Sequence, residues 1–168
     1  MRDDLFGSIE PQDLRGLRII GFAFVSGVFL FATIATALPF LGSGPSPFEL
    51  ATEARPLDIP VEEPDLGLVQ ILSMVHAFLF VIVFAMASVV PSMLAGRTPD
   101  KQKVGLFILR WAMLEGAALF GTVVVLLAGM DGVVPDQPIY YANLSSALVL
   151  LVFVVMDTWR LGDAVEVR

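Results

Sequence analysis

The sequence predicts an all-α membrane protein: a single membrane domain built as an antiparallel bundle of four transmembrane helices, with both termini in the cytoplasm. Three observations support this prediction. Hydrophobic residues make up 57% of the 168-residue chain and charged residues only 16%, against about 45–50% and about 25% in a typical soluble domain. Four stretches are each long and apolar enough to cross a bilayer, which takes about 20 residues. The Lys and Arg residues lie almost entirely on one side of these stretches.

The four predicted spans follow from long runs of residues without charge. The first run has no charged residue between Arg18 and Glu49, which is too long for the apolar core of a signal peptide. The third stretch is interrupted only by Arg110 and Glu115. Successive spans alternate in direction, so we expect an antiparallel bundle. The predicted spans cover residues 19–41, 66–94, 104–130 and 139–158.

The segments outside the spans carry opposite charge on the two sides. Nine of the ten Lys and Arg residues lie in or next to the N-terminal segment, the second connection and the C-terminal tail. Cytoplasmic segments carry such an excess, so both termini are expected in the cytoplasm and the chain in the inner (plasma) membrane of a bacterium. The predicted segments are a cytoplasmic interfacial segment (1–18), an acidic, proline-rich outer loop (42–65), a basic cytoplasmic loop (95–103), an outer turn (131–138) and a cytoplasmic tail (159–168).

Side chains near the membrane surface are expected to anchor the bundle. In the N-terminal segment, Leu14 and Leu17 are predicted to lie along the membrane surface. Tyr140, Tyr141 and Trp159 fit anchoring at the bilayer interfaces. The acidic outer loop is predicted to be extended or turn-rich. It serves either as a solvated cap or as an electrostatic funnel that concentrates cations at the outer mouth.

Several classes of function are disfavoured by composition. The chain has no cysteine, which excludes disulfides, thiolate metal sites, iron–sulfur ligation and a cysteine nucleophile. The net charge of −7 argues against a nucleic-acid partner, because such proteins carry a basic footprint. No zinc motif, phosphate loop or nucleophile–base set is present, and a single histidine disfavours haem. We therefore expect no enzyme, no cofactor and no metal site.

Glu115 is the first candidate site residue. It lies roughly 3 Å from the middle of its predicted span, at 1.5 Å of rise per residue. An ionisable group at this depth is expensive and marks a candidate site. Its carboxyl is expected to be protonated, paired or facing water, either as a proton or cation site or as a hydrogen-bonded acid that holds the bundle together. Small residues nearby permit close helix approach: Ala112, Gly116, Ala117 and Gly121.

His76, the only histidine, completes the candidate ion or proton site together with Glu115 and Thr122. His76 and Glu115 differ in predicted depth by roughly 9 Å, so direct contact is not expected, while a water-bridged relay stays open. Other polar residues of the outer half either form an entry path with His76 or hydrogen-bond one another across helices. These residues are Thr33, Thr36, Asn143, Ser145 and Ser146.

Arg110 and Asp157 are predicted to form a structural ion pair. Both lie on the cytoplasmic side of their spans, and folding the third and fourth spans about the outer turn places them within one helical turn of each other. Charges at this depth pair or reach toward the interface. We therefore expect a salt bridge near the cytoplasmic surface whose role is mainly structural.

One hairpin resembles a known family. Gly96–Asp100 (Gly-Arg-Thr-Pro-Asp), followed by a span with Leu114–Ala117 (Leu-Glu-Gly-Ala) and Leu119–Gly121 (Leu-Phe-Gly), is similar to the proteolipid (c) subunits of rotary ATP synthases. The resemblance covers at most residues 66–130. It implies a helical hairpin with a cytoplasmic loop and an ion-carrying carboxylate at Glu115.

The sequence therefore favours a non-enzymatic accessory or scaffold subunit of a membrane complex. Its expected partners are the lipid bilayer and other membrane subunits or a second copy of itself. The alternative is a proteolipid-like protein that translocates protons or cations by means of Glu115. An intramembrane enzyme or redox subunit is the interpretation that the residue inventory supports least.

Overall fold

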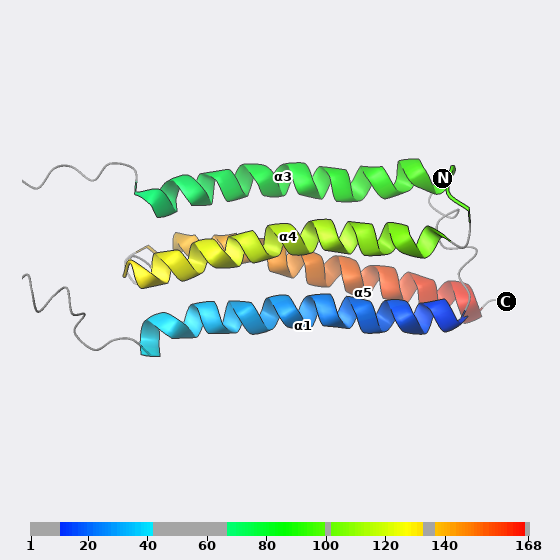
Figure 1. Cartoon of the computed structure of the whole chain (residues 1–168), viewed down its shortest axis with the longest axis horizontal. Coiled ribbons are helices and arrows are strands. Elements are labelled where there is room, and N and C mark those ends of the chain that lie inside the picture. Colours follow the sequence, from blue (N-terminus) through cyan, green and yellow to red (C-terminus); the bar gives the residue numbers. More distant parts are fainter. Residues whose placement is uncertain (1–10, 42–66, 100–101, 133–136, 167–168) are drawn as a thin grey trace, which may run out of the picture.

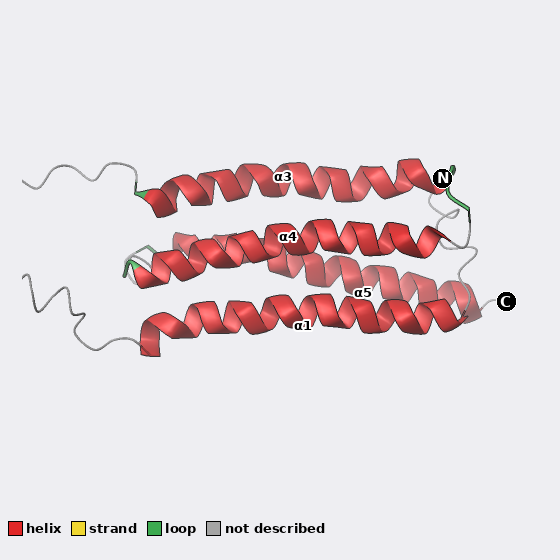
Figure 2. Cartoon of the chain, in the orientation of Figure 1, coloured by secondary structure: helices red, strands yellow, loops and turns green. Residues whose placement is uncertain are grey.

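The computed structural model describes residues 11–41, 67–99, 102–132 and 137–166. Within these ranges the chain is helical apart from short turns, and Figure 2 shows no strand among them. The predicted outer loop, 42–65, lies outside the described residues. The elements are α1 (Pro11–Leu41), α3 (Leu68–Ala95), α4 (Lys103–Met130), the 3₁₀ helix η3 (Pro138–Leu144) and α5 (Ser145–Glu166).

Four helical segments are long and apolar enough to cross a membrane, which confirms the predicted all-helical chain and its four candidate spans. This is the composition expected of a multi-pass membrane protein. The four segments are Gln12–Leu38, Leu68–Ala95, Lys103–Met130 and Pro138–Leu161.

Helix α4 is the central element of the bundle. It packs against α1, α3 and α5, whereas α3 packs chiefly against α4. Figure 1 shows α4 between α3 and α1, with α5 behind α4 and α1 in that view. As a result, half of the α4 span is buried inside the protein and only about a tenth of the α3 span. One side of α4 stays open between α3 and α1.

Helix α1 begins ahead of the predicted membrane span and buries two leucines that were assigned to the membrane surface. Proline is favoured in the first turn of a helix, and Pro11 is the first residue of α1. Leu14 and Leu17, expected along the membrane surface, instead lie in the hydrophobic core. They start a run with heptad-like spacing that continues through Gly21, Val28 and Ala35, and this spacing keeps one side of a long helix against its neighbours.

Close packing of α1 against the bundle depends on Gly21. A Cβ atom at this position would lie 2.8 Å from Cγ1 of Val154 and 3.1 Å from Cζ3 of Trp111. Both neighbours are buried in the core. The glycine therefore lets α1 approach α4 and α5 more closely than any residue with a side chain would allow.

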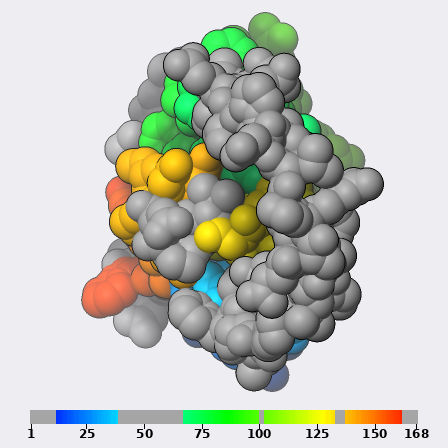
Figure 3. Space-filling view, turned by 90° about the vertical axis from the view of Figure 1, so that its left-hand side faces the viewer, coloured from blue at the N-terminus to red at the C-terminus, as the bar shows by residue number. Residues whose placement is uncertain are grey.

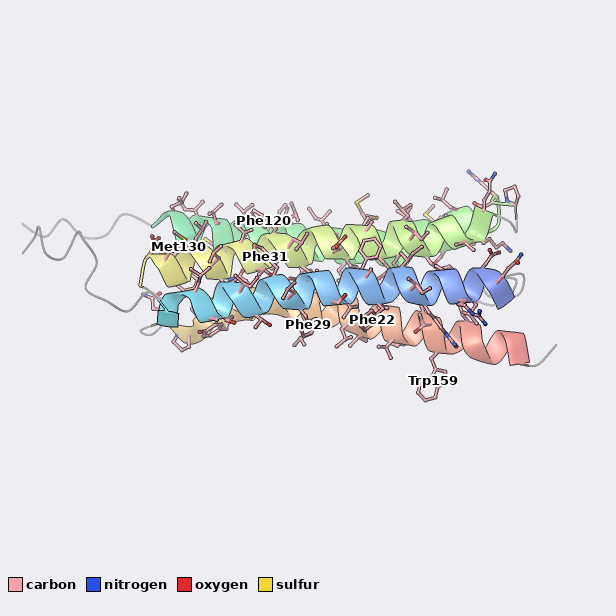
Figure 4. All side chains as sticks on the ribbon, turned by 60° about the horizontal axis from the view of Figure 1, so that its bottom comes forward. Phe22, Phe29, Phe31, Phe120, Met130 and Trp159 are labelled. Atoms are coloured by element: carbon pink, nitrogen blue, oxygen red, sulfur yellow. The ribbon has the colours of Figure 1, made fainter. Side chains whose placement is uncertain are left out.

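The outer surface of the bundle is strongly apolar. On α3, Phe78 is 72% exposed and Met93 is 69% exposed, and the buried residues of this helix form one narrow stripe. Figure 4 shows Trp159 projecting away from the bundle on α5, as expected for an interfacial anchor. Lipid tails solvate such surfaces as well as a protein core does, so the exposure is consistent with a position in a bilayer.

The fourth helical stretch begins at Pro138, one residue before the predicted start of the fourth span, and its first residues form the 3₁₀ helix η3. Helix α5 continues to Glu166, so the first part of the predicted tail is helical. Figure 3 views the bundle from the end where α4 finishes and shows η3 (orange) beside the end of α4 (yellow). Tyr140 of η3 is buried against Val69 and Val124. It therefore packs inside the bundle instead of lying at the lipid interface.

Candidate functional site

The predicted ion pair between Arg110 and Asp157 is present and forms the centre of a buried cluster. Nη1 of Arg110 donates to both carboxylate oxygens of Asp157, at 3.0 and 3.2 Å. Nε1 of Trp111 donates to Oδ2 of the same carboxylate at 3.0 Å. Asp157 is only 1% exposed, and a buried charge requires this degree of pairing. The pair joins α4 to α5.

The same guanidinium donates a hydrogen bond to a carbonyl of α3 that lacks its usual donor within the helix. In an α-helix, the carbonyl of Ala87 would accept a hydrogen bond from the N–H of residue 91, but Pro91 has no N–H. Nε of Arg110 donates to this carbonyl at 2.9 Å. The guanidinium also lies over the Phe153 ring, 5.0 Å from its centroid, within cation–π range. Arg110 thereby ties α3, α4 and α5 together. We call this set the Arg110 cluster: Ala87, Arg110, Trp111, Phe153 and Asp157.

Sequence reasoning found the charged pair but missed the other members of the Arg110 cluster. A proline inside a predicted span always frees the carbonyl four residues earlier, so Pro91 already pointed to Ala87. No sequence pattern indicates that Trp111 shares the carboxylate of Asp157 with Arg110. That contact depends on how α4 is rotated about its axis relative to α5.

His76 lies in a second buried cluster in the other half of the bundle. Its Nδ1 is 2.8 Å from Oδ1 of Asn143, and its Nε2 is 3.1 Å from the carbonyl oxygen of Ala117. The side chain is 2% exposed. Its ring is flanked by Phe80 and Phe120, with centroids 6.1 and 5.8 Å away. The histidine thus connects α3 to α4 and η3. We call this set the His76 cluster: Ser73, His76, Ala117, Asn143 and Ser146.

Asn143 is held in one orientation by its own contacts. Its Nδ2 donates to the carbonyl of Tyr140 at 2.8 Å and to Oγ of Ser73 at 2.8 Å. A carbonyl only accepts hydrogen bonds, so the amide nitrogen must face Tyr140. The amide oxygen therefore points at His76.

Gly121 makes the close approach of three elements possible. A Cβ atom there would overlap the carbonyl oxygen of Asn143 and lie 2.7 Å from Nε2 of His76. Oγ of Ser146 donates to the same Asn143 carbonyl at 3.0 Å. Two of the four small residues predicted to allow close helix approach, Ala117 and Gly121, contact other helical elements of this chain.

The remaining hydroxyl groups of the predicted polar layer do not form a shared site. Thr122 is fully buried, and its hydroxyl donates to the carbonyl of Ala118 in its own helix at 2.8 Å. Thr33 and Thr36 likewise donate to carbonyls of α1, and Ser145 is exposed. Threonine commonly satisfies its hydroxyl within a helix in this way.

Glu115 stands apart from both clusters. It is half-buried, and among the described residues the structure gives its carboxyl no hydrogen bond or ion pair. Ala117, which contacts His76, follows two residues later and is therefore about 200° away around the helix. The structure does not bring Glu115, His76 and Thr122 together. Instead, Glu115 lies beside Ala112 and Gly116, which are exposed on the open side of α4.

No metal centre is formed by the described ranges: they contain no group of three or more histidine and carboxylate residues that could hold an ion. Comparison with models of known protein families, with curated proteins and with solved structures gave no match. The two clusters and the exposed side of α4 are therefore the candidate functional features of the described ranges.

Proposed function

We propose that the chain is a non-enzymatic accessory or scaffold subunit of a membrane complex, which holds a partner helix against the open side of α4. The observation that carries this proposal is the position of Glu115. Its carboxyl has no partner within the described part of the chain, and the groups of the Arg110 cluster satisfy one another. We call this surface the Glu115 face: Ala112, Glu115 and Gly116.

The Glu115 face has the two properties that helix association in lipid requires. A charge at mid-membrane depth costs at least about 2.5 kcal/mol, so an unpaired carboxyl favours binding of a hydrogen-bond donor. Small residues let helix backbones approach closely. A Cβ atom at Gly116 would have no neighbour within 4 Å. The proposed partner is therefore a transmembrane helix that carries a basic, amide or hydroxyl side chain at this depth.

The proposal includes an antiparallel bundle with both termini in the cytoplasm of a bacterial cell. Two contacts support the antiparallel order: Arg110 contacts Asp157, and Gly121 lies next to Asn143. The later residue of α4 thus pairs with the earlier residue of the fourth helical stretch, as expected for helices that run in opposite directions. Figure 1 shows the start of α1 and the end of α5 at the same end of the bundle. That end carries the basic residues Arg15, Arg18, Arg97, Lys103 and Arg160, as cytoplasmic segments do.

Crosslinking in the native membrane tests the scaffold role. A photo-crosslinking residue placed at Gly116 is expected to capture a partner chain. The same residue at Leu148 of α5, which is 57% exposed, is expected to capture none. Adding Glu115→Leu should abolish the capture because it removes the acceptor. Adding Glu115→Gln should retain it, since an amide still accepts a hydrogen bond. Capture that is equal with and without Glu115→Leu, or equal at Leu148, contradicts the proposal.

The alternative function is translocation of protons or cations by Glu115. The observation in its favour is the same half-exposed, unpaired carboxyl, together with the resemblance of the 66–130 hairpin to proteolipid (c) subunits. Reconstituted protein would then show proton or sodium flux that Glu115→Gln abolishes. Glu115 would also react with a hydrophobic carbodiimide, and cations would suppress the reaction. If the chain is a scaffold subunit, we expect no proton or sodium flux that depends on Glu115.

A further inference from the structure

One face of α1 carries two arginines followed by two phenylalanines. Successive members are three, four and seven residues apart, and residues with this spacing share one face of a helix. All four side chains are exposed. Figure 4 shows the two phenylalanines where α1 borders α5. We call this surface the Arg18 face: Arg15, Arg18, Phe22 and Phe29.

The Arg18 face begins at the level of the lipid headgroups and continues into the hydrocarbon. Gly21 is level with Trp111, because a Cβ atom at Gly21 would lie 3.1 Å from that ring. Counted from the middle of α4 at 1.5 Å of rise per residue, Arg18 lies roughly 13 Å and Arg15 roughly 17 Å from the membrane midplane. The hydrocarbon core ends about 15 Å from the midplane. Phe22 lies roughly 6 Å deeper than Arg18, within reach of an acyl chain.

The two arginines of this face are unpaired within the described ranges, where the structure gives neither guanidinium a hydrogen bond or an ion pair. Like charges one turn apart on a helix repel each other, so an anion between them is favourable. Asp13 lies about 200° around the helix from Arg15, and Asp157 is buried against Arg110. The positive charge of the Arg18 face is therefore available to an anion from outside the chain.

Trp159 adds a hydrogen-bond donor at the same level on the neighbouring helix. A Cβ atom at Gly21 would lie 2.8 Å from Cγ1 of Val154, which sets the register of α1 against α5. Trp159 follows five residues after Val154, so it lies roughly 7.5 Å closer to the basic end of the bundle. This depth falls between those of Arg18 and Arg15. The indole is 70% exposed, and such a ring places its N–H at the headgroups and its apolar body in the hydrocarbon.

We propose that the Arg18 face binds an anionic phospholipid from the leaflet at the basic end of the bundle. The guanidiniums of Arg15 and Arg18 bind the phosphate, which arginine can hold through two parallel hydrogen bonds. An acyl chain lies along Phe22 and Phe29. The phenyl rings continue the face below the headgroup, so a phospholipid fits the whole surface and a free phosphate only its charged part. This inference does not depend on whether the Glu115 face binds a partner.

Native mass spectrometry of the full-length chain tests the charged half of the face. The chain is released from detergent micelles that contain equal amounts of phosphatidylglycerol and phosphatidylcholine. Wild type is expected to retain one phosphatidylglycerol molecule in preference to phosphatidylcholine. Arg18→Gln should weaken this retention about fivefold, the effect of one basic residue near an anionic lipid surface. Arg97→Gln removes an exposed arginine of the same end but of another helix, and should leave retention nearly unchanged.

Three outcomes of this experiment would overturn the proposal. Equal losses from Arg18→Gln and Arg97→Gln would show that only the overall charge of this end attracts lipid. Equal retention of the two lipids by wild type would show no anionic site. Displacement of phosphatidylglycerol by inorganic phosphate at the same concentration would show a site for a free anion only.

Phe22→Ala tests the apolar half of the face. It should weaken retention of phosphatidylglycerol because it removes a surface along which the acyl chain lies. Phe78→Ala on α3 is the matched control, since Phe78 is 72% exposed and Phe22 is 74% exposed. An equal effect of the two substitutions contradicts the proposal. Wild-type protein gives a second readout: a ligand that binds the folded state raises its melting temperature, so phosphatidylglycerol should raise it more than phosphatidylcholine, and equal values would also contradict the proposal.

Discussion

Asp157→Asn is expected to lower the free energy of unfolding by about 3 kcal/mol or more, because breaking a buried ion pair leaves one charge uncompensated. The substitution keeps the shape of the side chain and removes its charge. The Arg110 side chain is only 14% exposed, so water does not replace the lost carboxylate. Equilibrium unfolding in mixed detergent micelles measures the effect.

Removing both charges shows whether the cost of Asp157→Asn comes from leaving Arg110 as an unpaired buried charge. The double variant Arg110→Met, Asp157→Leu has neither charge of the ion pair. It should therefore be more stable than the single variant Asp157→Asn. It still leaves the Ala87 carbonyl without a donor. Adding Pro91→Ala restores the missing N–H and should recover further stability. Asp131→Asn, at an exposed position, is the matched control. A cost for Asp157→Asn no larger than that of the control would show that the pair is not structural.

Gly121→Ala is expected to destabilise the bundle strongly. Overpacking costs typically about 1–3 kcal/mol and sometimes more. The high end is expected here because the added Cβ overlaps a backbone oxygen, that of Asn143, which cannot move without displacing η3. It would also lie 2.7 Å from Nε2 of His76. The free energy of unfolding and the NMR signals of the His76 ring should both change.

Gly116→Ala is the matched control in the same helix. A Cβ at Gly116 meets nothing within 4 Å, and replacing a helical glycine with alanine stabilises by roughly 0.5–1 kcal/mol. In the isolated chain in detergent, this variant should be as stable as wild type or more so. Equal destabilisation by the two substitutions would contradict the packing described for Gly121.

The four helices of the bundle could be predicted from the sequence because charged residues lie near the ends of each apolar run. Long uncharged runs located the four helices. The same criterion did not reveal that helix α1 extends back to Pro11, because Arg15 and Arg18 interrupt the apolar run while Leu14 and Leu17 continue the buried spacing. Charge reports contact with water, whereas the length of a helix depends also on packing against its neighbours.

The position of each candidate residue along its helix could be predicted from the sequence. The direction in which its side chain points around the helix axis could not. Counting residues along spans placed Arg110 level with Asp157, and it placed His76 in the same half as Asn143. The partners of Trp111, and the open side on which Glu115 lies, depend on how each helix turns about its axis. Four helices with apolar residues on all sides carry little information on that rotation, because lipid and protein interior solvate them equally well.

Single-cysteine labelling tests the central claim, that the chain crosses the membrane four times with its basic ends in the cytoplasm. The chain has no cysteine of its own, and both Gln102 and Gln137 are exposed at ends of helices. A membrane-impermeant thiol reagent is expected to label Gln137→Cys, and not Gln102→Cys, in intact spheroplasts, with the reverse result in inverted vesicles. Labelling of both positions from one side, or recovery of the chain in the soluble fraction without detergent, would contradict the four-span arrangement.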